Sequence, residues 1–176
     1  MTGGLRPSPL TALVLVVRLP APLEALRVGS IADASAGVPA HVTLLYPFAD
    51  EAQLGAGVLG DVAAVVARHE RLRLTLGEGR RFSDTLYVSV EPEGPLRALH
   101  DDLAEAFPTL PLYGGTYPFT PHVSIVEGPA AHATDAFEDG RWSTLPVEQD
   151  VDAVDLITGR GGRWGTRRRF PLGAAG

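Results

Sequence analysis

Two short segments, one in each half of the chain, carry the same pattern of side chains. The first is the run Pro39–Leu45 and the second is the run Pro121–Val126. Each places a histidine, a valine, a hydroxyl residue and an aliphatic residue in that order after a nearby proline, and the two histidines are 81 residues apart. Internal similarity of this kind is typical of two related structural units. We therefore expect two lobes that each present the same short strand.

The order of residues in the repeat determines which side chains share a face. Residues two apart on a strand point to the same side of a sheet, so His41 projects with Thr43, and His122 projects with Ser124. The valine and the aliphatic residue of each segment face the opposite way, into a core. If a pseudo-two-fold axis relates the lobes, both imidazoles and both hydroxyls converge on one cleft.

Two imidazoles and two hydroxyls around one centre suit in-line attack at a phosphorus atom. Histidine titrates near pH ~6.5, so one neutral ring can act as general base while the other, protonated, acts as general acid. The hydroxyls can donate hydrogen bonds to the phosphoryl oxygens. The sequence offers no obvious carboxylate cage for a metal ion. The candidate catalytic residues are therefore His41, His122, Thr43 and Ser124, with no metal and no cofactor.

The paired His-x-Thr/Ser motifs, about half a chain apart, resemble those of the 2H phosphoesterase superfamily, also called the 2′-5′ RNA ligase family. The run His41–Phe48 is similar to the first motif of the family and the run Pro121–Ile125 to the second. Further similarities are the residues Gly79–Phe82 and the terminal strand Arg163–Leu172. Ser124 stands where many members have threonine, which keeps the hydrogen-bond donor but loses the methyl group that restrains the rotamer.

The resemblance implies a bilobed fold in which two antiparallel sheets line a central cleft, within a single domain of residues 1–176 with intertwined lobes. It also implies metal-independent hydrolysis of a cyclic phosphodiester, commonly a nucleoside 2′,3′-cyclic phosphate that is opened to the 2′-phosphate. Other members act on ADP-ribose 1″,2″-cyclic phosphate, on 2′-5′ linkages or on RNA ends, so RNA ligase activity stays open. The expected partner is a nucleotide or RNA end that bears a phosphate.

Hydrophobic periodicity predicts an α+β fold with antiparallel-rich sheet and helices outside. Alternating or continuous apolar runs predict strands at 10–18, 41–48, 71–76, 86–90, 122–127, 151–158 and 163–171. Helical spacing predicts helices at 21–31, 51–69, 95–107 and 130–137. The run Gly77–Arg81 is expected to form a turn between two strands, and Gly161-Gly162 the turn of the last hairpin.

Composition excludes several other classes of function. The length of 176 residues is that of one ordinary domain. The chain has no cysteine, and all 15 of its cationic side chains are arginine, which excludes thiolate chemistry and a lysine Schiff base. The net charge of −6 argues against non-specific coating of nucleic acid.

No apolar run approaches the ~20 residues that cross a bilayer. The apolar segment near the start of the sequence is interpreted as a strand rather than a signal peptide. We expect a cytoplasmic monomer without membrane contact.

Four further residues near the motifs are candidate substrate contacts, by stacking on a base or by reaching a phosphate: Tyr46, Arg81, Phe82 and Tyr117. The remaining histidines, His69, His100 and His132, are expected to be structural or solvated. Two alternatives to a two-histidine enzyme stay open. One is a module of the same fold that binds a nucleotide or RNA end without turnover. The other is a metal-dependent hydrolase that uses both motif histidines as ligands, which needs a third ligand that the sequence does not identify.

Overall fold

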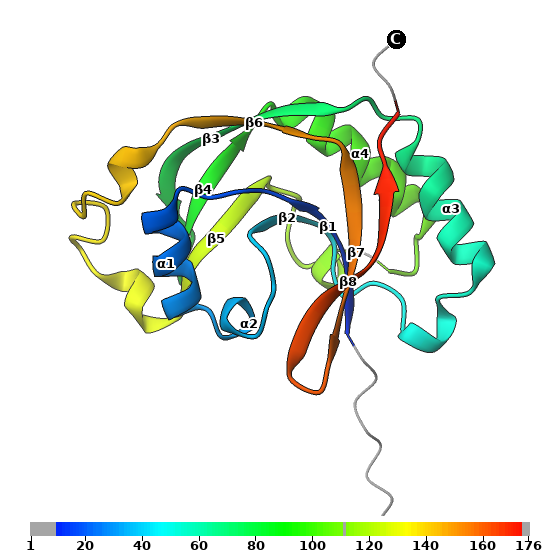
Figure 1. Ribbon diagram of the computed structural model, residues 1–176, viewed down its shortest axis with the longest axis horizontal. Coiled ribbons are helices and arrows are strands. Elements are labelled where there is room, and N and C mark those ends of the chain that lie inside the picture. The colour runs from blue at the N-terminus through cyan, green and yellow to red at the C-terminus, as the bar shows by residue number, and fades with distance from the viewer. Residues whose placement is uncertain (1–9, 111, 174–176) are drawn as a thin grey trace, which may run out of the picture.

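The computed structural model describes residues 10–110 and 112–173. In this part of the chain, eight strands form two four-stranded sheets, and every neighbouring pair of strands is antiparallel (Figure 1). The first sheet has the order β2-β1-β7-β8, with bounds Thr11–Val16 for β1, His41–Leu45 for β2, Ala153–Arg160 for β7 and Arg163–Pro171 for β8. The second has the order β5-β4-β3-β6, with bounds Leu72–Arg81 for β3, Thr85–Glu91 for β4, His122–Glu127 for β5 and Val147–Val151 for β6.

Helices flank these sheets, so the predicted α+β class with two antiparallel sheets is confirmed. Their bounds in the described residues are Ala21–Ser30 for α1, Ala32–Ser35 for α2, Ala56–Val66 for α3 and Glu93–Ala106 for α4. In α4, Leu96, Leu99 and Leu103 recur at helical spacing and are fully buried, so one apolar stripe fixes the helix on the core. None of the helices in 10–110 and 112–173 has the length and apolar character that a membrane-crossing helix needs.

Each motif strand is the last strand of a strand–helix–strand unit, and the two units are interlocked. The first unit contains β1, α1 and β2, and the second contains β4, α4 and β5. Helix α1 packs against β5 of the second unit, whereas α4 packs against β2 of the first. Strands β2 and β5 are edge strands of their own sheets and contact each other near the middle of the molecule (Figure 1). Because each helix packs on the motif strand of the other unit, the two motifs lie close together.

Both motif strands contain the same irregularity. The pairing of β1 with β2 shifts so that Leu44 is an extra residue on β2, and the pairing of β4 with β5 shifts so that Ile125 is an extra residue on β5. Each extra residue directly follows the motif hydroxyl, Thr43 or Ser124, and each is fully buried. A β-bulge bends its strand and re-aims the neighbouring side chains. The pseudo-symmetry of the fold thus extends to single residues at the motifs.

The turn expected at Gly77–Arg81 is wrong, because these residues continue β3 and the chain reverses only after them. Here glycine serves close packing rather than turn geometry. A Cβ on Gly77 would lie 2.6 Å from Oγ of Ser89, and a Cβ on Gly79 would lie 2.6 Å from the indole of Trp142. Side chains from neighbouring segments therefore occupy the space that a larger residue would need.

In the last three strands, one predicted strand is wrong and the predicted final hairpin is confirmed. The strand predicted at 151–158 is the end of β6 and the start of β7, which belong to different sheets. Strand β6 is mostly polar and lies at a sheet edge, so it shows no apolar alternation to predict it. The final hairpin is confirmed, because Gly161 and Gly162 both have positive φ angles, 57° and 77°, as a type I′ turn requires.

The helix boundaries also differ from the predictions. The helix predicted at 51–69 begins only at Ala56, after a separate 3₁₀ turn at Glu51–Gln53. The segment predicted as a helix at 130–137 contains a single 3₁₀ turn, Pro129–His132. Both differences concern the polar or proline-containing ends of segments, where apolar spacing carries little information.

Candidate active site

The two motif histidines are oriented by equivalent hydrogen bonds. Nδ1 of His41 lies 2.7 Å from the carbonyl oxygen of Pro39, and Nδ1 of His122 lies 2.7 Å from the carbonyl oxygen of Thr120. A carbonyl can only accept, so Nδ1 carries the hydrogen in both rings. In the neutral ring this leaves Nε2 with its lone pair available for a proton. Each carbonyl belongs to the residue two positions earlier, so the local backbone sets the tautomer.

Both motifs line one cavity of about 290 Å³. His41 and Thr43 come from β2, and His122 and Ser124 come from β5, as the repeat predicted. The cavity also has an apolar part, to which β1, the segment before β2, β7 and β8 contribute Ala12, Val38, Ile157 and Trp164. The same cavity thus combines a polar centre between the sheets with a hydrophobic compartment beside it.

Burial favours the neutral form of both rings. Desolvation lowers the pKa of His41 to about 4; the positive charges of Arg27 and His122 act in the same direction, and the hydrogen bond to Pro39 opposes them. Desolvation also lowers the pKa of His122, against the opposing effect of its hydrogen bond to Thr120. At neutral pH the cavity therefore presents two imidazoles that can accept a proton.

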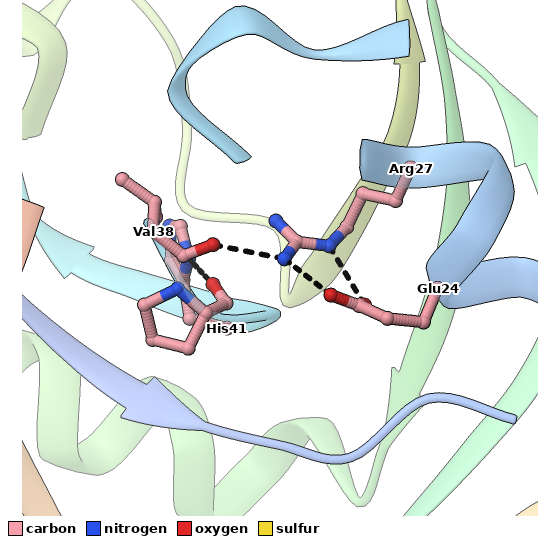
Figure 2. Close-up of polar contacts among 5 residues, drawn as sticks. Glu24, Arg27, Val38 and His41 are labelled. Atoms are coloured by element: carbon pink, nitrogen blue, oxygen red, sulfur yellow. Dashed lines mark hydrogen bonds and ion pairs between the residues drawn. The ribbon is translucent and has the colours of Figure 1, made fainter. Parts of the chain in front are cut away.

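Arg27 is a cavity residue that the sequence did not reveal (Figure 2). It lies on α1, is only 3% exposed and lines the cavity with both histidines. Its Nε and Nη2 donate to the carboxylate of Glu24 at 2.9 and 2.8 Å, and Nη2 also donates to the carbonyl oxygen of Val38 at 2.8 Å. One residue after Val38, the Pro39 carbonyl holds the ring of His41. Arg27 therefore braces the segment that orients His41.

Two tyrosines stand beside each other at the cavity. The rings of Tyr46 and Tyr113 meet edge to face with their centroids 6.1 Å apart, and the amide of Tyr113 donates to the carbonyl of Tyr46 at 2.7 Å. Tyr113 has a φ of 47°, a left-handed conformation that is uncommon outside glycine. Desolvation raises the pKa of both phenols, so they are neutral hydrogen-bonding groups.

Acidic residues also reach the cavity. Asp33 and Glu127 line it, and Glu127 follows the second motif on β5. Desolvation raises the pKa of the Glu127 carboxyl, which a hydrogen bond from Ser124 opposes. An anionic ligand would therefore meet the acidic side chains of Asp33 and Glu127 as well as the positive charge of Arg27.

The four candidate substrate contacts lie in different surroundings. Tyr46 lines the cavity, and the Phe82 ring packs edge to face on His122 with centroids 5.0 Å apart. Arg81 donates to the carbonyl oxygen of Ala133 at 2.6 Å and is not among the cavity-lining residues. Tyr117 is 68% exposed and does not line the cavity either. The aromatic residue that the 112–120 segment contributes to the cavity is Tyr113.

Two of the other histidines make specific contacts outside the cavity. Nε2 of His69 lies 2.9 Å from the carboxylate of Asp102. The ring of His100 stacks on Phe119 with centroids 4.3 Å apart. His132 is exposed. Among residues 10–110 and 112–173, no group of three or more histidine and acidic side chains is arranged to hold a metal ion.

Known proteins resemble this chain in sequence pattern and in fold. A family model described as the 2′-5′ RNA ligase superfamily matches residues 16–163. No curated protein sequence matches the chain. The structure of TT0787 of Thermus thermophilus superposes with a TM-score of 0.63 at 18% identity, covering 95% of this chain and 100% of that one. E. coli LigT complexed with 3′-AMP superposes with a TM-score of 0.59 at 16% identity, covering 94% and 99%.

A structure described as a phosphoesterase has a TM-score of 0.60 at 18% identity and covers 94% of this chain and 99% of its own. These identities are low, so the superpositions establish the fold. The family model covers most of the chain, including both histidine motifs. The chain therefore belongs to the 2′-5′ RNA ligase superfamily, the family that its paired motifs resemble.

Proposed function

We propose that this protein is a cyclic phosphodiesterase that opens nucleoside 2′,3′-cyclic phosphates, free or at an RNA end, by general acid–base catalysis from its own side chains. The observation that carries the proposal is the placement of His41 and His122 at equivalent positions of two sheets, around one cavity that also contains Thr43 and Ser124. Two equivalent proton-transfer groups on either side of one space suit a reaction that needs a base and an acid.

In the proposed reaction, Nε2 of one histidine removes a proton from water and the water oxygen attacks phosphorus. The bond between phosphorus and the 3′-oxygen breaks, and the second histidine gives its proton to that oxygen, which leaves a 2′-phosphate. Exchange with solvent then returns the base to its neutral form and the acid to its protonated form. We assign His41 as the base, because a pKa of about 4 keeps its lone pair free over the whole neutral range.

The remaining parts of the cavity fit the remaining parts of such a substrate. The hydroxyls of Thr43 and Ser124 donate to the non-bridging phosphoryl oxygens, and Ser124 gives up its hydrogen bond to Glu127 when the ligand binds. The nucleobase enters the apolar compartment and stacks on Trp164, whose indole is partly buried against Val38 and Ile157. The presence of 3′-AMP in the structure of E. coli LigT supports a nucleotide as the class of ligand.

The test is a panel of nucleoside 2′,3′-cyclic phosphates and other cyclic phosphodiesters, assayed with and without EDTA. Phosphorus NMR identifies which oxygen keeps the phosphate. We expect turnover that EDTA does not reduce and a 2′-phosphate product. Loss of turnover in EDTA would support the metal-dependent alternative. Tight binding of a cyclic phosphate that stays intact after long incubation would support a binding module.

A further inference from the structure

We propose that Arg27 is an anion anchor of this cavity, which binds a phosphoryl oxygen through Nη1 and thereby selects ligands that carry a phosphate. The inference deepens the proposed function and takes from it the phosphate as the ligand group. It assigns a binding role to a residue outside both histidine motifs. Its basis is the geometry of one buried guanidinium group.

The guanidinium of Arg27 is held on one side only. Nε and Nη2 are used by Glu24 and by the Val38 carbonyl, whereas Nη1 has no hydrogen-bond partner among the described residues (Figure 2). Nη1 is accessible to solvent. In this part of the chain, Oγ1 of Thr158 is the one side-chain polar atom that has neither a hydrogen-bond partner nor solvent access. Because Arg27 is nearly fully buried and lines the cavity, the cavity is the open space that Nη1 can reach.

The carboxylate of Glu24 compensates the charge of this buried guanidinium, but Nη1 keeps two N–H donors that no acceptor among the described residues uses. The charge of Arg27 lowers the pKa of His41, which agrees with the base role proposed for that ring. The contacts to Glu24 and to the Val38 carbonyl use only Nε and Nη2, so neither of them requires Nη1. An arginine that is fixed by Glu24 and keeps two N–H donors free is already ordered for a phosphate, because little side-chain entropy remains to be lost on binding.

The position of α1 explains why this residue can reach the motifs. Helix α1 follows β1 in the first unit but packs against β5 of the second. Arg27 therefore enters the cavity between the two motif strands, where Thr43 and Ser124 also point. A phosphoryl group bound there would accept hydrogen bonds from two hydroxyls and one guanidinium.

The experiment measures ligand binding by calorimetry, so it needs no turnover. The probes are adenosine 2′-monophosphate, inorganic phosphate and adenosine. The variants are Arg27→Met, Arg27→Lys and, as a matched loss of one exposed positive charge, Arg80→Met, whose side chain pairs with Glu78 on β3. Loss of a charge-assisted hydrogen bond predicts an affinity about tenfold or more weaker for both phosphate probes in Arg27→Met. We expect unchanged affinity for adenosine, partial retention in Arg27→Lys and no effect of Arg80→Met.

A purely structural role for Arg27 predicts a different pattern. If Arg27 only braces the segment before His41, Arg27→Met weakens adenosine and its 2′-phosphate equally, and that result would overturn the proposal. Glu24→Gln is an independent test of the two roles, because it weakens the contact that holds Arg27 in place and keeps the positive charge of the guanidinium. We expect phosphate affinity within about threefold of the wild type for Glu24→Gln, and a loss as large as that of Arg27→Met would also overturn the proposal.

The outcome is informative even when one variant fails. If Arg27→Met does not fold, as judged by its thermal unfolding, the comparison of Arg27→Lys with Glu24→Gln decides between the two roles. If the protein turns over no cyclic phosphate at all, selective loss of phosphate binding still establishes the anchor, and the failure then belongs to the proposed activity. Unchanged phosphate binding in a folded Arg27→Met variant refutes the anchor whatever the activity.

Discussion

Nδ1 of His100 lies 2.9 Å from the carbonyl oxygen of Leu44, the extra residue of the bulge behind Thr43. The imidazole of His100 is stacked nearly parallel on Phe119, at an interplanar angle of 5°. A residue of α4, in the second unit, therefore holds the bulge in the first motif. The contact couples the two interlocked units at the point where the Thr43 hydroxyl is aimed.

Replacing His100 with phenylalanine should keep the stacking on Phe119 and remove the hydrogen bond to Leu44. Loss of a partner for a buried carbonyl predicts a decrease of about 1–3 kcal/mol in the free energy of unfolding. Urea denaturation measures this change. The matched control is His132→Phe, because His132 is exposed, and it should lie within about 0.5 kcal/mol of the wild type. Equal stability of the two variants would contradict a structural role for the His100 contact.

Removing either motif imidazole should abolish most of the proposed turnover. General acid–base catalysis contributes about 10²–10⁴-fold per role, so His41→Ala and His122→Ala should each reduce kcat by that factor on a nucleoside 2′,3′-cyclic phosphate. Steady-state kinetics gives the value, and far-ultraviolet circular dichroism shows that the fold is kept. Near wild-type turnover in either folded variant would rule out the two-histidine scheme.

The pKa values of the two histidines predict an acidic optimum. The active form in the proposed scheme has neutral His41 and protonated His122. His41 loses its proton as the pH rises through about 4, and His122 loses its proton at a pH below the ordinary histidine value of 6.5. The plot of kcat/KM against pH should therefore rise above about 4, reach its maximum below 6.5 and fall at higher pH. A maximum above pH ~7 would contradict the assignment of these roles.

The motif strands could be predicted closely from the sequence because their information is local. The segment His122–Glu127 is a strand with the predicted bounds, and the His-x-hydroxyl spacing places both polar side chains on the cavity side. The meeting of the two motifs followed from the repeat, since related units tend to be placed symmetrically. The bulges at Leu44 and Ile125 were not predicted, because a register shift is a property of the paired strand and leaves no mark in a single segment.

Arg27 could not be predicted as a cavity residue from the sequence. An arginine between two apolar residues on a helix is usually solvated, and only the packing of α1 against β5 turns it into a cavity residue. From the 112–120 segment, Tyr117 is the predicted contact, but the structure places Tyr113, which has a left-handed backbone, at the cavity instead. The single domain, the monomeric state and the cytoplasmic location stay predictions.

The proposed base compartment can be altered without changing a reacting group. The indole of Trp164 lies across the hairpin on Gly159, and a Cβ at that position would be 2.8 Å from Cε2 of the ring. Gly159→Ala must therefore displace the indole. Gly165→Ala is the matched control, because Gly165 is the neighbour of Trp164 in the chain and a Cβ there meets no atom within 4 Å.

Because a stacked base contributes about 1–3 kcal/mol to binding, Trp164→Ala should weaken nucleotide affinity by about tenfold or more. Gly159→Ala should raise KM several-fold and leave kcat nearly unchanged, since the base contact is made equally in the ground state and the transition state. Steady-state kinetics separates the two parameters for each variant. The same rise in KM for Gly165→Ala, or a fall in kcat with an unchanged KM for Gly159→Ala, would show that the indole of Trp164 does not bind the base.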